Sequence, residues 1–253
     1  MWPFSHKHTL EQSGFLKGYT DWHSHLLPGV DDGVQTLEET LEILKLYERL
    51  GVSCVHLTPH VMEDVPNTIE GLKKAYSELQ KAYSDSGGTI ELRLAAENML
   101  DSLFEERLER GEVLGLDAEG GRMLLVETSY FTPPMNFREL LERVKSKGWF
   151  PLLAHPERYV YMTAQDYEDL HAAGVRFQLN WYSLTGLYGP TPRRKADWLL
   201  RRGFYTLSGS DTHRLRILHQ ALSASLPKST CSRLRALAQR SGGGLQNDLA
   251  AHG

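Results

Sequence analysis

Cysteine is scarce in this chain of 253 residues, which contains only Cys54 and Cys231. The two cysteines lie far apart, one in an apolar run and the other in a polar segment. This spacing indicates neither a disulfide framework nor a cysteine-rich zinc site. Cys54 is expected to be a small buried hydrophobic residue.

A strong excess of one charge and long apolar runs are also missing. The formal net charge of −4 gives no general reason to expect a nucleic-acid partner. The opening MWPFSHKHTL has no apolar run long enough for a signal peptide, and no later stretch approaches the length of a membrane span. We therefore expect a cytoplasmic protein with no membrane insertion.

One basic cluster is the exception to this even distribution of charge. Its residues are spaced as on one helix and represent either a solvated face or a nucleic-acid surface, of which the solvated face is the commoner case. The cluster consists of Arg193, Arg194, Lys195, Arg201 and Arg202.

Short apolar runs alternate along the chain with segments of helical period, which is typical of parallel strands covered by helices. The length fits one domain over residues 1–253, and residues from about 241 are expected to be disordered because of their composition. The predicted strands are Tyr19–His23, Cys54–Thr58, Ile90–Ala96, Met123–Glu127, Phe150–Ala154, Val175–Leu179 and Tyr205–Ser208.

The first predicted helix has clear start and stop signals. Thr36 followed by Glu39 has the spacing of a capping box, and Gly51 marks the end of the helix.

Two histidines on alternate residues, His23 and His25, are the first candidates for a functional site. On an extended strand their side chains leave from the same face, as two ligands of one metal ion do. A His-x-His pair alone is as compatible with ordinary hydrogen bonding. Asp21 shares this face and either orients an imidazole or has a purely structural role.

The remaining histidines and acids of interest favour the metal interpretation, because nearly every predicted strand ends in one of them. In a barrel of parallel strands these ends meet at one face, where active sites lie. Solvated loop residues have no reason to choose such positions. The candidates are His23, His25, His60, Glu97, Glu127, His155, Asp211 and His213.

Six segments, in this order, resemble the PHP family of metal-dependent phosphoesterases, named for polymerase and histidinol phosphatase. They are DWHSHLLPGVDDG, LTPH, AAEN, LLVET, LLAHPERY and SGSDTH. The closest branch is that of the bacterial protein-tyrosine phosphatases of capsule and exopolysaccharide gene clusters. Acidic residues at Asp32 and Glu127, where histidinol-phosphate phosphatases often have histidine, favour this branch.

The resemblance implies a single PHP phosphoesterase domain, a distorted seven-stranded (β/α) barrel of TIM-like form. It also implies three adjacent divalent ions, with manganese favoured over iron or zinc. Glu97 would bridge two of the ions. The implied ligand sets are His23, His25, Glu97 and Asp211 for the first ion, Asp32, His60 and His213 for the second, and Glu97, Glu127 and His155 for the third.

The same resemblance implies hydrolysis of phosphotyrosine. Clustered ions lower the pKa of a bound water, and the resulting hydroxide attacks phosphorus in line. Arg158 and Asp32 are the predicted catalytic residues, and Arg158 and Arg214 the predicted phosphate-binding residues. A surface salt bridge is the alternative role for Arg158.

Other phosphatase mechanisms find no support in the sequence. A thiol mechanism needs arginine six positions after cysteine, where this chain has His60 and Leu237, and no Asp-x-Asp nucleophile motif occurs. The expected partner is a tyrosine-phosphorylated protein, in particular a bacterial tyrosine kinase. Histidinol phosphate or another small phosphomonoester is the alternative substrate, and a catalytically inactive metal-binding protein is the alternative class.

The substrate's ring has candidate contacts in the stretch QLNWYSLTGLYG. Trp181, Tyr182 and Tyr188 either stack on a phosphotyrosine ring or pack beneath the loop. The oligomeric state is not indicated by the sequence.

Overall fold

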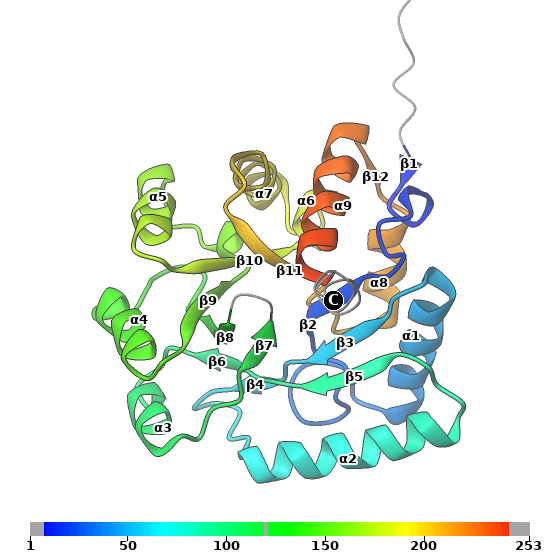
Figure 1. The fold of residues 1–253 in the computed structure, drawn as a ribbon, viewed down its shortest axis with the longest axis horizontal. Helices are drawn as coiled ribbons and strands as arrows, with labels where there is room; N and C mark the ends of the chain where they lie inside the picture. The colour runs from blue at the N-terminus through cyan, green and yellow to red at the C-terminus, as the bar shows by residue number, and fades with distance from the viewer. Residues whose placement is uncertain (1–7, 119–120, 243–253) are drawn as a thin grey trace, which may run out of the picture.

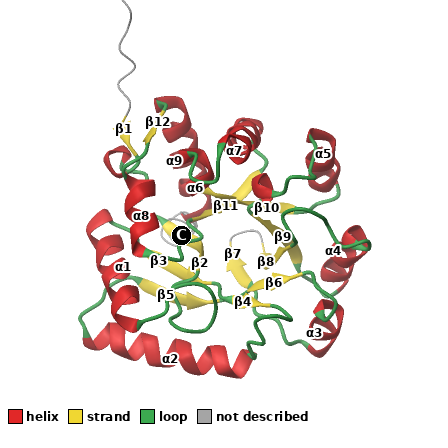
Figure 2. Cartoon of the chain, turned by 180° about the vertical axis from the view of Figure 1, so that it is seen from behind, coloured by secondary structure: helices red, strands yellow, loops and turns green. Residues whose placement is uncertain are grey.

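The computed structural model describes residues 8–118 and 121–242. Strands alternate with helices along the chain, and the helices lie around the outside of the strands (Figures 1 and 2). The predicted disorder from about residue 241 falls largely on residues 243–253, which lie outside the described residues, whereas Ser241 and Gly242 end helix α9 (Lys228–Gly242).

Parallel strands follow one another around a ring in the described part of the chain. Seven strand positions make up the ring, and two of them are each divided into two short strands. In order they are β2 (Thr20–Ser24), β3 and β4 (Cys54–Leu57 and His60–Val61), β5 and β6 (Glu91–Leu94 and Glu97–Met99), β8 (Gly121–Glu127), β9 (Phe150–Ala154), β10 (Arg176–Asn180) and β11 (Tyr205–Gly209).

The last strand, β11, returns to the first at its carboxyl end. The backbone N–H of Asp211 donates to the carbonyl of His23 over 2.7 Å, and that of His25 donates to the carbonyl of Thr212 over 3.0 Å. A parallel bridge joins Ser24 to Thr212. The predicted distorted (β/α) barrel is therefore confirmed.

Two strands differ from the prediction because each is interrupted and then resumes. The predicted strands Cys54–Thr58 and Ile90–Ala96 are continued by β4 and β6, which begin at His60 and Glu97. Proline has no N–H to donate to a ladder, so Pro59 favours the break. Pairing nevertheless continues, because the N–H of Glu97 donates to the Pro59 carbonyl over 3.1 Å and His60 is the register partner of Glu97.

The helices begin and end largely where the sequence signals predict. Thr36 accepts a hydrogen bond from the Glu39 N–H and caps α1 (Leu37–Leu50), and Gly51 ends this helix with a positive φ of 84°. The capping box is incomplete, because the Glu39 carboxylate accepts instead from the N–H of Leu215 over 3.0 Å. Glu39 thereby ties the starts of α1 and α8 (Leu215–Leu222) together.

The other helices cover the outside of the ring or lie in the loops that follow strands. They are α2 (Ile69–Asp85), α3 (Phe104–Arg110), α4 (Phe137–Ser146), α5 (Ala164–Ala172), α6 (Trp181–Thr185) and α7 (Pro190–Arg202), with the 3-10 turns η1 (Glu11–Ser13) and η2 (Pro156–Arg158). Short antiparallel strands add to the edges, with β1 (His8–Thr9) on β12 (Ser225–Leu226) and β7 (Leu116–Ala118) on β8. No helix in the described ranges combines the length and apolar character needed to span a bilayer.

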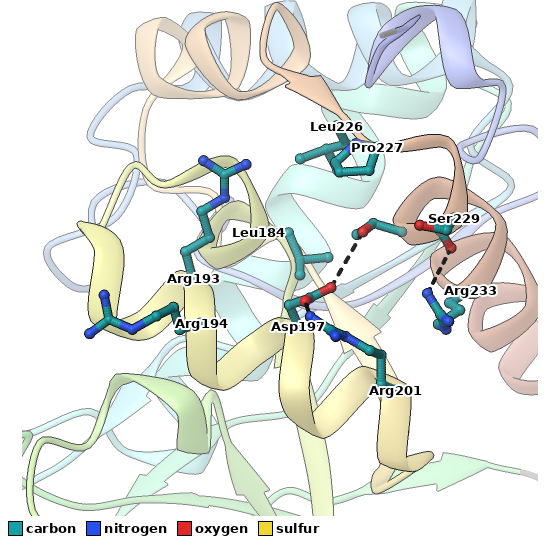
Figure 3. A pocket seen from close by; sticks show the side chains of 10 residues that line it. Leu184, Arg193, Arg194, Asp197, Arg201, Leu226, Pro227, Ser229 and Arg233 are labelled. Carbon is teal, nitrogen blue, oxygen red and sulfur yellow. Dashed lines mark hydrogen bonds and ion pairs between the residues drawn. The ribbon is translucent and has the colours of Figure 1, made fainter. Parts of the chain in front are cut away.

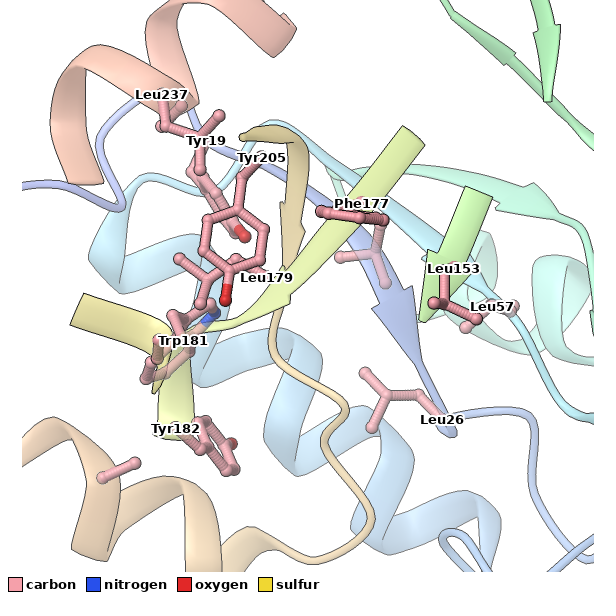
Figure 4. Packing of buried hydrophobic residues seen from close by; sticks show 14 of the residues in the cluster. Tyr19, Leu26, Leu57, Leu153, Phe177, Leu179, Trp181, Tyr182, Tyr205 and Leu237 are labelled. Carbon is pink, nitrogen blue, oxygen red and sulfur yellow. The ribbon is translucent and has the colours of Figure 1, made fainter. Parts of the chain in front are cut away.

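The core has two layers because the side chains of a strand alternate between its faces. On β9, Leu152 and Ala154 belong to a cluster that also contains Trp22 and Met123. Leu153, between them, joins the larger cluster. Figure 4 shows part of that larger layer, where aromatic and leucine side chains of β10, β11 and α9 pack together.

Candidate metal centre

The nine predicted ligands lie together at the carboxyl ends of the barrel strands. Most of them are buried, His60 and His213 are partly exposed, and the Asp32 side chain is 71% exposed. The residues are His23, His25, Asp32, His60, Glu97, Glu127, His155, Asp211 and His213.

The first predicted ligand set converges on one point. The Nε2 atoms of His23 and His25 lie 3.1 Å apart. Oε2 of Glu97 lies 3.2 and 3.3 Å from these two nitrogens, and Oδ1 of Asp211 lies 3.6 and 3.3 Å from them. Four donor atoms therefore face the same small volume, which suits a metal ion.

The second predicted set lies at the exposed edge of the first. Oδ1 of Asp32 is 3.4 Å from Nε2 of both His60 and His213. The ring of His25 stacks on that of His213 with centroids 4.1 Å apart. Ligand atoms of His25, Asp32, His60 and His213 all lie within 4.8 Å of one another.

The third predicted set contains one contact that the sequence did not indicate. Nε2 of His155 lies 2.9 Å from Oε1 of Glu97 and 3.8 Å from Oε2 of Glu127, as expected for a shared ion. Nδ1 of His60 also faces this group, 2.9 Å from Oε1 of Glu127 and 3.3 Å from Oε2 of Glu97. His60 thus lies between the second and third sets.

Several buried polar atoms of the centre make no hydrogen bond of good geometry. They include Oε2 of Glu97, Oε1 of Glu127 and Nδ1 of His60. Buried polar groups are rarely left unpaired, because the loss of hydration is costly. A divalent cation would satisfy such atoms, so the side chains present fit a metal centre.

The charges of the centre are strongly coupled. Burial raises the pKa of the Glu97 and Asp211 carboxyls, but nearby histidines outweigh this effect and hold both pKa values well below the usual range. Burial lowers the pKa of His25, but the opposite effect of Asp31, Asp211 and Glu97 is larger. The pKa of His25 therefore lies well above its ordinary value. Protons and cations compete for these imidazoles, so ion binding would release protons.

Three imidazoles are oriented through their Nδ1 atoms. Nδ1 of His25 donates to Oδ2 of Asp31 over 2.8 Å, Nδ1 of His23 donates to Oε1 of Gln178 over 3.0 Å, and Nδ1 of His213 donates to the Asp211 carbonyl over 2.8 Å. With Nδ1 protonated, Nε2 keeps its lone pair for an ion.

Asp31 and Gln178 are site residues that the sequence analysis missed. Asp31 also accepts from the backbone N–H of His60 over 3.0 Å, and Gln178 accepts from that of His155 over 3.1 Å. The paired aspartates of the DDG stretch were the available signal for Asp31, whereas Gln178 lies on β10 with no motif around it.

The contacts of Asp21 fit the structural alternative. Its carboxylate accepts from the N–H and hydroxyl of Ser210, over 2.8 and 2.6 Å, and from the Tyr47 hydroxyl over 3.1 Å. Burial raises the pKa of Asp21 to about 6. This residue holds β2 against the segment that follows β11.

The backbone is strained at two of the predicted ligands. Among the described non-glycine residues, those with positive φ are His155, at 30°, and Asp211, at 55°. Such conformations cost free energy and persist where the surrounding structure holds them. Their occurrence at these positions supports a functional role for the centre.

Both predicted phosphate-binding arginines lie beside the centre. The Arg158 guanidinium lies between the rings of Tyr130 and Tyr188, 4.4 and 4.3 Å from their centroids. Nη1 of Arg214 donates to the carbonyls of Asp32, Gly33 and His213. Arg214 thus joins the loop of Asp32 to the loop of His213.

The aromatic residues of the QLNWYSLTGLYG stretch have different surroundings. Trp181 and Tyr182 are fully buried, and the Tyr182 hydroxyl lies 2.6 Å from that of Thr212. These two pack beneath the loop. Tyr188 is partly exposed and lies on Arg158.

The basic cluster does not form one continuous face. Lys195 donates to the carbonyls of Tyr159 and Met162, and Arg202 pairs with Glu168. The remaining arginines line a cleft of about 370 Å³ between α7 and α9, together with Arg233 (Figure 3). Arg201 is neutralised there by Asp197.

Neither cysteine is available for nucleophilic chemistry. Both are buried and unpaired. Burial raises the pKa of the Cys54 thiol to about 12, so it stays protonated at neutral pH.

Comparison with known proteins gives a consistent result. The family described as "Capsular polysaccharide synthesis, CpsB/CapC" matches residues 19–225, which include every predicted site residue. The putative tyrosine-protein phosphatase CapC of Staphylococcus aureus is 26% identical over 196 residues, 76% of each chain. The tyrosine-protein phosphatase CpsB of Streptococcus agalactiae is 29% identical over 205 residues, 78% of this chain and 84% of that one.

The fold is also found in a solved structure. It comes from work on YwqE of Bacillus subtilis and CpsB of Streptococcus pneumoniae, which are described as unique metal-dependent tyrosine phosphatases. The TM-score is 0.71 at 22% identity, over 87% of this chain and 94% of that one.

Proposed function

Because the chain belongs to the CpsB/CapC family of capsular polysaccharide synthesis, we propose that it is a metal-dependent protein-tyrosine phosphatase of the cytoplasm. The observation that carries the proposal is the convergence of nine histidine and carboxylate side chains into three adjoining groups, two of which share Glu97. The names of the relatives support the same activity.

Three divalent ions, with manganese the first choice, account best for the donors. We assign the first ion to His23, His25, Glu97 and Asp211, the second to Asp32, His60 and His213, and the third to Glu97, Glu127 and His155. Glu97 suits a bridging role, because Oε2 faces His23 and His25 while Oε1 faces His155. Mixed imidazole and carboxylate ligands also suit iron or zinc.

Ions bound there would supply the charge that lowers the pKa of a water and offsets the negative phosphoryl oxygens. The chain supplies orientation. Arg158 has its guanidinium held between two tyrosine rings, which preorganises a planar fork for phosphoryl oxygens. The Asp32 carboxylate is ionised at neutral pH, as aspartates ordinarily are, and its exposed side chain can accept a hydrogen bond from a water at the centre.

The proposed substrate is a tyrosine-phosphorylated protein, in particular a bacterial tyrosine kinase. The Asp32 side chain is the most exposed part of the centre, so a phosphotyrosine presented on a protein segment can reach it from outside. Histidinol phosphate is the second candidate.

A substrate panel tests the proposal. Protein stripped of metal and reloaded with manganese would be assayed on a phosphotyrosine peptide, histidinol phosphate and single-stranded DNA. We expect turnover of the phosphotyrosine peptide only after reloading. Much more efficient turnover of histidinol phosphate would replace the proposal with the second candidate. His155→Ala is the internal control and should lower both metal content and rate.

A further inference from the structure

Large apolar side chains are exposed on the loops that follow β8 and β9, which also carry Tyr130 and Arg158 of the candidate site. Phe131 is 74% exposed and Val160 58% exposed, and Met135 is fully exposed. Isolated exposed apolar residues are common, but a group of them beside a functional centre suggests an interaction surface. We call Phe131, Val160 and Met135 the apolar rim.

The apolar rim is continuous with the site through two backbone segments. Phe131 directly follows Tyr130, whose ring lies on the Arg158 guanidinium. The Tyr130 carbonyl accepts a hydrogen bond from the N–H of Val160 over 2.9 Å. The loops after β8 and β9 therefore place Phe131 and Val160 next to the residues that surround Arg158.

Further contacts fasten these two loops together. The hydroxyls of Thr128 and Tyr161 lie 2.7 Å apart, and the Tyr159 hydroxyl accepts from the Thr128 N–H over 3.3 Å. The rings of Tyr159 and Tyr161 stack with centroids 5.6 Å apart. The backbone that carries Phe131 and Val160 is thus held in place before any ligand arrives, which lowers the entropic cost of binding.

A groove continues outward from the rim. It has a volume of about 420 Å³ and lies between the start of α4 and the segment that leads into α5. Its apolar lining includes Pro133, Pro134, Met135, Tyr161, Met162 and Leu170. Tyr161 of the groove directly follows Val160 of the rim, and Met135 also lines the groove, so rim and groove adjoin on the two loops that carry Tyr130 and Arg158.

We propose that the apolar rim and this groove bind apolar side chains that flank the phosphotyrosine in an extended segment of the protein substrate. The inference rests on the proposed phosphatase function. Extended peptides commonly gain specificity when flanking side chains enter fixed pockets. The position of rim and groove on the loops that carry Tyr130 and Arg158 favours the substrate over a second copy of the chain as the occupant.

The test compares three substrates on manganese-loaded protein. They are free phosphotyrosine, a phosphotyrosine peptide with leucine on both sides, and the same peptide with serine at those positions. The wild type should prefer the leucine peptide. Phe131→Ser should lower kcat/KM for that peptide about tenfold, as expected when a large apolar contact is lost, and should leave free phosphotyrosine unaffected.

Phe150→Ser is the matched control. Phe150 is 43% exposed and begins β9, at the opposite end of that strand from the site. This variant should retain the full preference for the leucine peptide. Met135→Ser provides a second rim variant, at a fully exposed side chain that makes no contribution to the core. Thermal unfolding would check that all three variants fold.

The possible failures are distinguishable. Absence of turnover on every phosphotyrosine substrate would overturn the proposed function and this inference with it. Turnover without a preference for leucine, or equal losses on free phosphotyrosine and peptide in Phe131→Ser, would overturn the inference alone. A change of oligomeric state in Phe131→Ser with unchanged peptide kinetics would assign the rim to self-association and also overturn it.

Discussion

Nη1 of Arg158 donates a hydrogen bond to Oδ2 of Asp211 over 2.6 Å, across 53 residues of sequence. Oδ1 of the same carboxylate faces His23 and His25. Asp211 therefore connects the proposed phosphate-binding arginine to the first ligand group. Asn180 donates to the same Oδ2 over 2.9 Å, so the carboxylate keeps one donor when Arg158 is replaced.

Arg158→Ala should lower turnover by on the order of 10²–10³-fold, as the removal of other preorganised charge stabilisers does. Lysine at this position should restore only part of the rate, because it lacks the planar fork. Metal content should remain, since Asn180 still holds Asp211. Steady-state kinetics beside elemental analysis checks both points. Near wild-type turnover would assign Arg158 to structure alone, and loss of the ions would make its main role the support of Asp211.

Asp31→Asn should weaken metal binding by roughly 10–100-fold, the usual effect of removing a carboxylate that orients a ligating histidine. The side chain is replaced by one of equal size, so the fold should persist. Competition with a chelator measures the affinity. Asp64→Asn, at an exposed aspartate, is the matched control and should bind metal like the wild type. Equal affinity in both variants would show that the Asp31 contact to His25 does not tune the centre.

Chelators should abolish phosphotyrosine hydrolysis, whereas Cys54→Ser should retain it. The reason is that the Cys54 thiol is buried with its pKa raised to about 12, and a thiol is nucleophilic only as the thiolate. Activity assays before and after metal stripping, on both proteins, provide the measurement. Inactivity of a folded Cys54→Ser protein, or activity that survives stripping, would contradict the metal mechanism.

His56→Phe should reduce the loss of stability in acid. Burial lowers the pKa of His56 from 6.5 to about 3, so between these values the unfolded chain binds a proton that the folded chain does not. Stability from this group is therefore full above about pH 6.5 and is lost as the pH falls. At pH 5 the loss is about 2 kcal/mol relative to pH 7.5.

Denaturant unfolding of both proteins at pH 7.5 and pH 5 measures this difference. Phenylalanine can keep the stacking on Trp22, whose ring centroid lies 4.4 Å from that of His56. All other ionisable groups are the same in the two proteins, so their contributions cancel in the comparison. An identical pH dependence in the two proteins would show that His56 is not the acid-sensitive group.

The sequence predicted the strands well where one apolar run makes one strand. Phe150–Ala154 was predicted with the observed bounds of β9. The resumption of both strands was missed: the predicted strand Cys54–Thr58 stops before Pro59, and the predicted strand Ile90–Ala96 stops before Glu97, because the polar residues that begin β4 and β6 do not continue an apolar run. These missed strands affect the candidate site, because the first residues after the two breaks are the predicted ligands His60 and Glu97.

The convergence of the ligands was predictable because parallel strands bring their carboxyl ends to one face. The roles of Gln178 and of the Arg158 contact to Asp211 were not, since each depends on side chains that are distant in sequence and carry no motif. The dual position of His60 likewise follows from the pairing of β4 with β6, which no local pattern announces.

The short strands β4 and β6 place His60 and Glu97 on hydrogen-bonded backbone and not on free loops. The conformational entropy of these two ligands is therefore lost when the barrel folds and not when an ion binds. Ion binding and folding of the barrel are accordingly separable events. Calorimetric titration with manganese should then give a small change in heat capacity, unlike the large negative change of a site that folds around its metal.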